Sequence, residues 1–148
     1  MSRAEPMHGE KGSALIELVA GLSILVTLIL GAAEFGRLAY AGIEVSNAAH
    51  AGAAYGSESR TYAADITNIR TAATQDAPDV PGLTATASYF CQCSNGSSST
   101  CAVTDCSTSR IITYITVNTT GTINPLIYLP GLPKSYILSG QAVMRVEQ

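Results

Sequence analysis

The chain has 148 residues, of which 13% are charged, and its formal net charge is -3. A chain of this length forms one domain at most. The charge is mild and forms no basic stripe, so we expect no nucleic-acid partner. Much of the hydrophobicity lies in one N-terminal block, and the rest must build its core from roughly 90 residues.

The N-terminal block has the composition of a membrane span. Met1–Gly12 is short and polar and is typical of a leader, whereas no residue from Leu18 to Ala33 is charged. With residues 13–16 added, this block reaches the roughly 20 residues that a bilayer requires, provided that Glu17 is tolerated. A buried core helix is the alternative, but no other segment is apolar enough to surround it.

The helical pattern continues beyond the apolar block. Apolar and small residues recur at spacings of three and four through residues 34–55, and no proline occurs between Gly12 and Ala77. We therefore predict one helix over residues 13–55, ended by Gly56 and Ser57. Its stripe is built largely from alanine and glycine, which allow a close approach of another backbone. That backbone belongs either to the protein's own domain or to partners in an assembly. Different stretches of the helix can pack against each of these.

The remaining sequence predicts a small mixed domain. Residues 62–76 have the spacing of a short helix, and residues 77–83 form a proline-glycine turn. Residues 84–94, 111–123 and 136–147 alternate apolar and polar side chains, as half-buried antiparallel strands do. A proline-rich crossing, residues 124–133, joins the last two strands. The fold class is therefore α+β, with a leader at 1–12, a long helix at 13–56 (membrane-spanning over about 13–33) and an extracytoplasmic domain at 57–148.

The four cysteines, Cys91, Cys93, Cys101 and Cys106, lie close together in sequence. An even count in a small domain beside an export segment favours disulfides in an oxidising compartment. Cys91 and Cys93 point to one face of a strand, and a bond between them would be strained. Each is expected to pair across, as Cys91–Cys106 with Cys93–Cys101 or in the crossed alternative. A structural zinc site is the competing interpretation, but paired C-x2-C spacings are missing.

No catalytic or metal-binding pattern stands out. His50 lies on the long helix with no nucleophile pattern near it, and His8 lies in the leader. The aspartates show no metal-loop spacing. We expect no enzymatic activity, no cofactor and no metal, and interpret His50 as a polar interface residue.

Glu17 is the residue of the apolar block that needs an explanation. A carboxylate costs about 2.5–3.5 kcal/mol at mid-bilayer and less near the interface, where it can extend to the headgroups. If the chain is cut after Gly12, Ser13 becomes a new N-terminus with an ammonium group, and Glu17 is then the fifth residue. It would lie near the helix N-terminus, where the helix dipole favours an anion. It could pair with its own ammonium or with that of a neighbouring subunit.

These residues resemble a known family. KGSALIE resembles the type IV prepilin cleavage motif. Residues 12–56 are similar to the TadE/TadG-like pseudopilins of the tight-adherence (Flp) pilus, in the G-S-A start, the apolar span and the E-F-G-R step that contains Glu34, Phe35 and Arg37. The stretch NAAHAGA follows, with His50 in the usual arginine place. The C-terminal YLPGLPKSYILSGQAVMRVE also resembles the ending of the family.

The resemblance implies a pilin-like structural subunit, a minor pilin or pseudopilin. It implies cleavage by a prepilin peptidase between Gly12 and Ser13, and assembly through Glu17, Glu34, Phe35 and Arg37. It places the chain in the bacterial inner membrane as a single-pass protein, with a cytoplasmic N-terminus and an extracytoplasmic domain, or outside the cell in a pilus after assembly. The implied partners are the peptidase, other pilins or pseudopilins, the assembly platform, membrane lipid and copies of itself.

Three competing functions remain at this stage. The first is an adhesin-like binding module, displayed on the cell surface or at a pilus tip, with the loop Ser94–Thr100 as its contact surface. The second is a secreted protein released by signal-peptide cleavage after Ala33, since Gly31-Ala32-Ala33 fits such a site. The third is a secreted enzyme, for which no site is evident.

Overall fold

The computed structural model describes residues 10–102, 104–128, 131 and 133–147. The elements in chain order are α1 (Glu10–Ser57), α2 (Arg60–Ala64), α3 (Ile66–Asp76), β1 (Thr84–Cys93), β2 (Ser98–Ser99), β3 (Ile111–Ile123) and β4 (Tyr136–Arg145). The chain divides into two compact units, Met1–Arg37 and Leu38–Gln148, here called the N-terminal and C-terminal units.

In the N-terminal unit, the described residues lie in helix α1. Every residue from Gly12 to Ala33 is exposed. Two hydroxyl groups within this apolar stretch bond to their own helix: Ser23 Oγ donates to the carbonyl of Ala20, and Thr27 Oγ1 donates to that of Ser23, both at 2.8 Å. Such bonds leave no hydroxyl hydrogen in need of water, which suits a helix in an apolar medium.

The short helix predicted over residues 62–76 is two helices in the structure, α2 and α3. They meet at Asp65, which leaves the helical conformation with φ -88° and ψ 69°. Ser59 accepts a hydrogen bond from the Tyr62 N–H and caps α2, and Asp65 accepts one from the Asn68 N–H at 3.1 Å and caps α3. Serine and aspartate are favoured N-caps because they satisfy free amides of the first turn.

The sheet is antiparallel with the order β2-β1-β3-β4. Its three long strands confirm the predicted alternation. The short strand β2 was not predicted; it forms because the chain reverses at Gly96, whose φ of +92° suits glycine, and Cys93 N–H donates to the Ser97 carbonyl at 2.8 Å.

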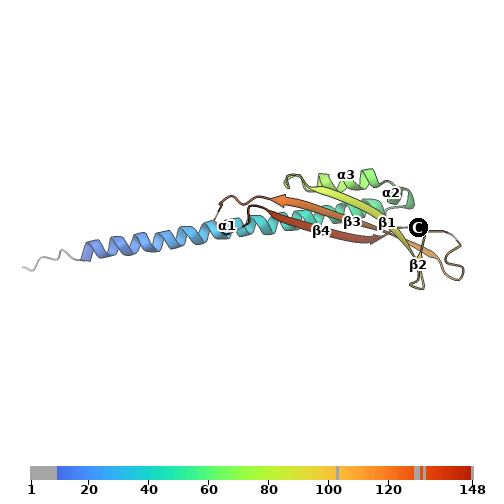
Figure 1. The fold of residues 1–148 in the computed structure, drawn as a ribbon, viewed down its shortest axis with the longest axis horizontal. Coiled ribbons are helices and arrows are strands. Elements are labelled where there is room, and N and C mark those ends of the chain that lie inside the picture. Colours follow the sequence, from blue (N-terminus) through green and yellow to red (C-terminus); the bar gives the residue numbers. More distant parts are fainter. Residues whose placement is uncertain (1–9, 103, 129–130, 132, 148) are drawn as a thin grey trace, which may run out of the picture. The chain divides into compact units, whose positions relative to one another are not determined.

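The core of the C-terminal unit lies between one face of the sheet and the helices (Figure 1). Small residues of α1 make this packing close. A Cβ added at Gly52 would lie 2.9 Å from Ala73 Cβ, and one added at Gly56 would lie 2.9 Å from Ile69 Cδ1. At Gly42, by contrast, an added Cβ would meet nothing within 4 Å. The small-residue stripe therefore packs on the protein's own domain at Gly52 and Gly56.

The closest approach of α1 to the sheet involves three residues that were not singled out in the sequence. Thr119 Oγ1 is fully buried and donates to the Val45 carbonyl of α1 at 2.6 Å. A Cβ added at Gly140 would lie 2.6 Å from that same carbonyl oxygen, and one added at Gly121 would lie 3.2 Å from Val45 Cγ2. A glycine inside a strand is the sequence signal for such an approach.

The opposite face of the sheet is nearly uncharged and is polar in its middle, and Ile137 and Val143 are also exposed on it. Threonine, serine, asparagine and glutamine side chains fill its middle, and Gln141 Nε2 donates to Asn118 Oδ1 at 2.7 Å. Towards one end, the rings of Phe90 and Tyr114 stack with centroids 5.2 Å apart. An antiparallel sheet with one buried and one solvated face explains the alternation in sequence.

The predicted fold class is confirmed: a long apolar N-terminal helix, short helices, a small antiparallel sheet and two disulfides. The predicted domain boundaries stay predictions. Most of the predicted leader, with His8, lies outside the described residues, as does part of the proline-rich crossing.

Candidate functional site

The predicted processing positions lie near the start of α1. Gly12 and Ser13 are helical and exposed, and Glu17 is exposed one helical turn further on. Within the part of the chain that the structure describes, Glu17 has no ion-pair partner. The structure therefore places Glu17 beside the position where cleavage would create an ammonium group.

The helix surface around Glu17 is apolar and uncovered. Leu18, Leu22 and Leu25 follow Glu17 along the same surface, and their exposed fractions are 64%, 55% and 53%. Full burial of such a side chain is worth about 1.5–3 kcal/mol, so a surface of this kind is covered by lipid or protein in its working state. The large exposed side chains of the segment are Leu15, Ile16, Leu18, Val19, Leu22, Ile24, Leu25, Val26, Leu28, Ile29 and Leu30.

By length and composition, α1 can cross a membrane, and among the described residues it is the one helix that can. Signal sequences pass the same test. The helix fits a single-pass membrane protein, and its apolar part lies entirely before Glu34.

The first charges after the apolar stretch form an ion pair. Arg37 Nη2 lies 3.0 Å from Glu34 Oε1, an i,i+3 pair on the helix surface. The side chains of Arg37 and Glu34 are 35% and 19% exposed. Phe35 is 76% exposed and lies on another side of the helix. The structure thus brings two of these three predicted assembly residues together and leaves Phe35 apart.

His50 is exposed on α1 in the C-terminal unit. No group of three or more histidine, cysteine, aspartate or glutamate side chains among the described residues could hold a metal ion. The arrangement around His50 therefore gives no basis for assigning it a ligand.

The cysteines form two disulfides, in the crossed alternative of the two predicted pairings. Cys91 bonds to Cys101 with Cα atoms 5.1 Å apart, and Cys93 bonds to Cys106 with Cα atoms 5.6 Å apart. The reason is the pairing of β2: Cys91 lies opposite Ser99, which brings Cys101 beside it and leaves Cys93 for Cys106. All four thiols are consumed, so the zinc alternative does not apply.

Asp105 organises the loop between the disulfides. Its Oδ2 accepts hydrogen bonds from the Thr100 N–H at 2.6 Å, from Thr100 Oγ1 at 2.8 Å and from Ser99 Oγ at 3.1 Å. The bonds from Thr100 come first among the causes that lower the pKa of Asp105. This role of Asp105 was not predicted from the sequence, because an aspartate that bonds to a loop leaves no spacing pattern of the kind a metal loop has.

The comparisons with known proteins bear on α1. The family model of TadE-like proteins matches residues 12–54. The match begins at Gly12 and includes Glu17 and the Glu34–Arg37 pair. Comparisons with curated proteins and with solved structures gave no match. The resemblance to the TadE-like family is therefore confirmed over residues 12–54, and that family suggests a pilin-like protein associated with the Tad pilus.

Proposed function

We propose that this chain is a minor pilin or pseudopilin of a Tad-type pilus. A prepilin peptidase cuts between Gly12 and Ser13, and the apolar part of α1 then holds the protein in the inner membrane. The N-terminus faces the cytoplasm and the disulfide-bonded domain faces outward. Assembly proceeds through the N-terminal part of α1, which docks against other pilin-like subunits.

The observation that carries this proposal is the exposed apolar surface of α1. Between the proposed cleavage position and Ala33, Glu17 is the one charged residue on this surface. An anchor alone needs the apolar surface but not the carboxylate. A carboxylate in that position is costly unless it has a partner. A Ser13 ammonium created by cleavage supplies that partner.

The magnitudes favour such pairing. Two opposite unit charges 4 Å apart attract by about 4 kcal/mol at an effective dielectric constant near 20, which is comparable to the insertion cost of the carboxylate. An α-amino group has an ordinary pKa of about 7.7–8.0 and is mostly protonated at neutral pH. Pairing between neighbouring subunits would make Glu17 favour the docked state over the isolated one.

Two features support the outward orientation of the domain and the retention of the anchor. The disulfides require an oxidising compartment, which excludes the bacterial cytoplasm as their usual location. Signal-peptide cleavage after Ala33 would remove Glu17 and the apolar surface, whereas the TadE-like match extends across that position from residue 12 to residue 54. A retained helix accounts for the match on both sides of Ala33.

The test replaces Glu17 in the native host and follows three quantities separately: membrane insertion, loss of the leader and recovery in sheared pili. We expect Glu17→Ala and Glu17→Gln to insert and to be cleaved as the wild type is, and to fall at least tenfold in the pilus fraction. Ser23→Ala is the matched control, since Ser23 bonds only to its own helix. Wild-type recovery of Glu17→Gln in pili would contradict the proposed pairing.

A further inference from the structure

The sheet extends beyond the end of α1, and a pocket forms there. Helix α1 ends at Ser57, whose carbonyl accepts a hydrogen bond from the Glu147 N–H at 2.8 Å. Past this point, residues of α2 and of the disulfide loop line a pocket together with residues of β1 and β3. The pocket that results has a volume of about 530 Å³ and lies wholly within the C-terminal unit.

The floor of the pocket is rigid. Cys91, Cys106 and Thr113 line it and are 6%, 8% and 9% exposed, and Thr113 Oγ1 lies 3.7 Å from Cys91 Sγ. Both disulfides contribute to the lining: Cys91 and Cys101 form one, and Cys106 belongs to the other. A floor held by two covalent cross-links keeps its shape without a ligand, which lowers the entropy cost of binding.

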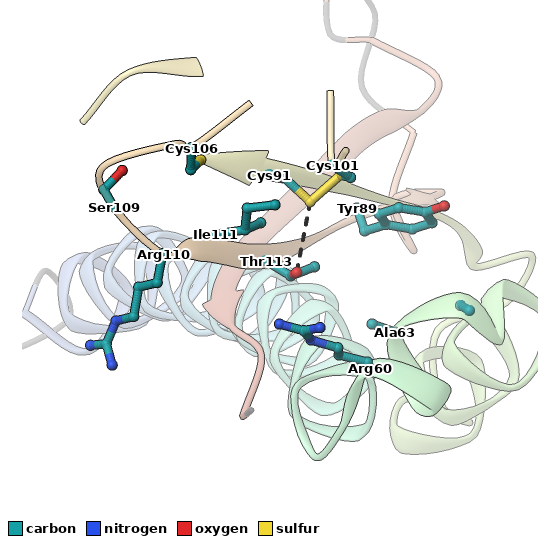
Figure 2. Close-up of a pocket in the computed structure, with 11 residues that line it drawn as sticks. Arg60, Ala63, Tyr89, Cys91, Cys101, Cys106, Ser109, Arg110, Ile111 and Thr113 are labelled. Carbon is teal, nitrogen blue, oxygen red and sulfur yellow. Dashed lines mark hydrogen bonds between the residues drawn. A yellow bond between two sulfur atoms is a disulfide. The ribbon is translucent and has the colours of Figure 1, made fainter. Parts of the chain in front are cut away.

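Two arginines line the pocket from different elements. In Figure 2 the side chain of Arg60, from α2, points toward Thr113 on the side of the pocket away from the Cys91–Cys101 disulfide, while Arg110 lies on the opposite flank, past Ile111, with its guanidinium extending outward. Arg60 is therefore placed to contact a bound group directly. Arg110 is placed to attract one from the rim.

Neither arginine is held in an ion pair within the described part of the chain, although Glu147 lines a second hollow together with Arg110. Within the described residues, neither Arg60 nor Arg110 has an ion pair or a side-chain hydrogen bond. Other arginines of the chain differ: Arg37 pairs with Glu34, and Arg70 Nε donates to the Ala85 carbonyl at 2.9 Å. Asp105, in the same loop region, already accepts its three hydrogen bonds from Ser99 and Thr100. The pocket therefore presents unpaired positive charge, which selects an anion.

The remaining lining selects a ligand with a ring-sized body. Tyr89 is half-exposed at the edge of the pocket, and the disulfide sulfurs and Ala63 add apolar surface. An aromatic face beside a mixed floor packs against the C–H face of a sugar ring, and guanidinium groups match the geometry of a carboxylate. The volume lies in the range of small-molecule sites.

We propose that this pocket binds a sugar that carries a carboxylate, such as a uronic acid unit of an acidic polysaccharide. Arg60 pairs with the carboxylate, Tyr89 packs against the ring, and Arg110 raises the local attraction for the anion. The site is separate from the N-terminal part of α1. It makes the displayed domain a receptor for an acidic glycan, and its test does not depend on pilus assembly.

The experiment uses the full chain in nonionic detergent micelles and ligand-observed saturation-transfer NMR. The probes are glucuronate, glucose (the same ring without the carboxylate) and acetate (a carboxylate without the ring). We expect saturable binding of glucuronate, at least tenfold weaker binding of glucose and acetate, and weakening by added salt. Arg60→Gln should weaken glucuronate binding at least tenfold, and Arg110→Gln should weaken it two- to threefold.

Lys134→Gln is the matched charge control, because Lys134 precedes β4 at the end of the sheet remote from the pocket and should leave binding unchanged. Tyr89→Leu keeps an apolar side chain and should weaken glucuronate but not acetate. Circular dichroism of each variant establishes that it is folded. The proposal is overturned if glucuronate does not saturate, if glucose or acetate binds equally well, or if folded Arg60→Gln binds as the wild type does.

Discussion

Gly140→Ala tests the close approach of strand β4 to helix α1. The added Cβ would lie 2.6 Å from the Val45 carbonyl oxygen, 2.8 Å from Ser46 Cα and 2.8 Å from Thr119 Oγ1. The first two are backbone atoms of α1, which cannot rotate away as a side chain can. Strand β4 and helix α1 must therefore separate locally for the methyl group to fit.

The size of the effect follows from three contributions. Overpacking of a close contact costs about 1–3 kcal/mol. Loss of the buried hydrogen bond from Thr119 to the Val45 carbonyl adds about 1 kcal/mol. Alanine restricts the unfolded chain more than glycine does, which returns about 0.4–1 kcal/mol. The net loss in the free energy of unfolding is about 2–3 kcal/mol.

The assay is urea unfolding of the full chain in nonionic detergent, followed by tyrosine fluorescence, since the chain has 7 tyrosines and no tryptophan. With a slope of about 1–3 kcal/mol/M, the midpoint of Gly140→Ala should fall by about 0.7–3 M. Gly42→Ala is the matched control: its Cβ meets nothing within 4 Å, and alanine in a helix gains up to about 1 kcal/mol. Equal midpoints for Gly140→Ala and the wild type would refute the close packing of α1 on the sheet.

Three further predictions concern the same unit. Replacing both Cys93 and Cys106 by alanine should lower the free energy of unfolding by about 3 kcal/mol, because a disulfide of this span removes that much loop-closure entropy from the unfolded chain. Urea unfolding measures the loss, and an unchanged midpoint would contradict the prediction. The pKa of Asp105 is lowered in the folded state, so at a pH below its ordinary value the unfolded chain binds more protons than the folded one, and stability decreases as the pH decreases. Asp105→Asn should make the free energy of unfolding less dependent on pH in this acidic range. Parallel curves of stability against pH for the variant and the wild type would refute the role of this carboxylate. Thr119→Val keeps the shape of the side chain but removes the hydroxyl that donates to the Val45 carbonyl. The free energy of unfolding should fall by about 1 kcal/mol, because that carbonyl keeps its hydrogen bond within the helix. A loss above about 3 kcal/mol would contradict the assignment of this single hydrogen bond to the hydroxyl.

The features of the fold that depend on local pattern could be predicted from the sequence. The uncharged run that ends at Ala33 is explained by burial in an apolar medium. The alternation of residues 111–123 is explained by a half-buried strand. The break at Asp65 could not be separated from a continuous helix by spacing alone, because Ile66 and Ile69 fit either arrangement. Its signal was the capping ability of an aspartate within the pattern.

The tertiary contacts of the candidate sites were less predictable. The disulfide pairing depended on β2, a strand of two residues whose register no alternation could reveal. The pocket depended on where α1 ends relative to β1 and β3, which places Arg60 and Arg110, about 50 positions apart in sequence, on two flanks of one pocket. Gly121 and Gly140 carried the clearest overlooked signal, since a glycine within a strand indicates a close backbone approach.

The most direct test of the pilin account is the intact mass of the mature protein from its native host, measured with and without reduction. We predict an N-terminus at Ser13 and a gain of four hydrogen atoms on reduction of the two disulfides. A mature chain that begins at Met1 would contradict processing and leave Glu17 without its partner. A chain that begins at Glu34 would identify a secreted protein and contradict the account entirely.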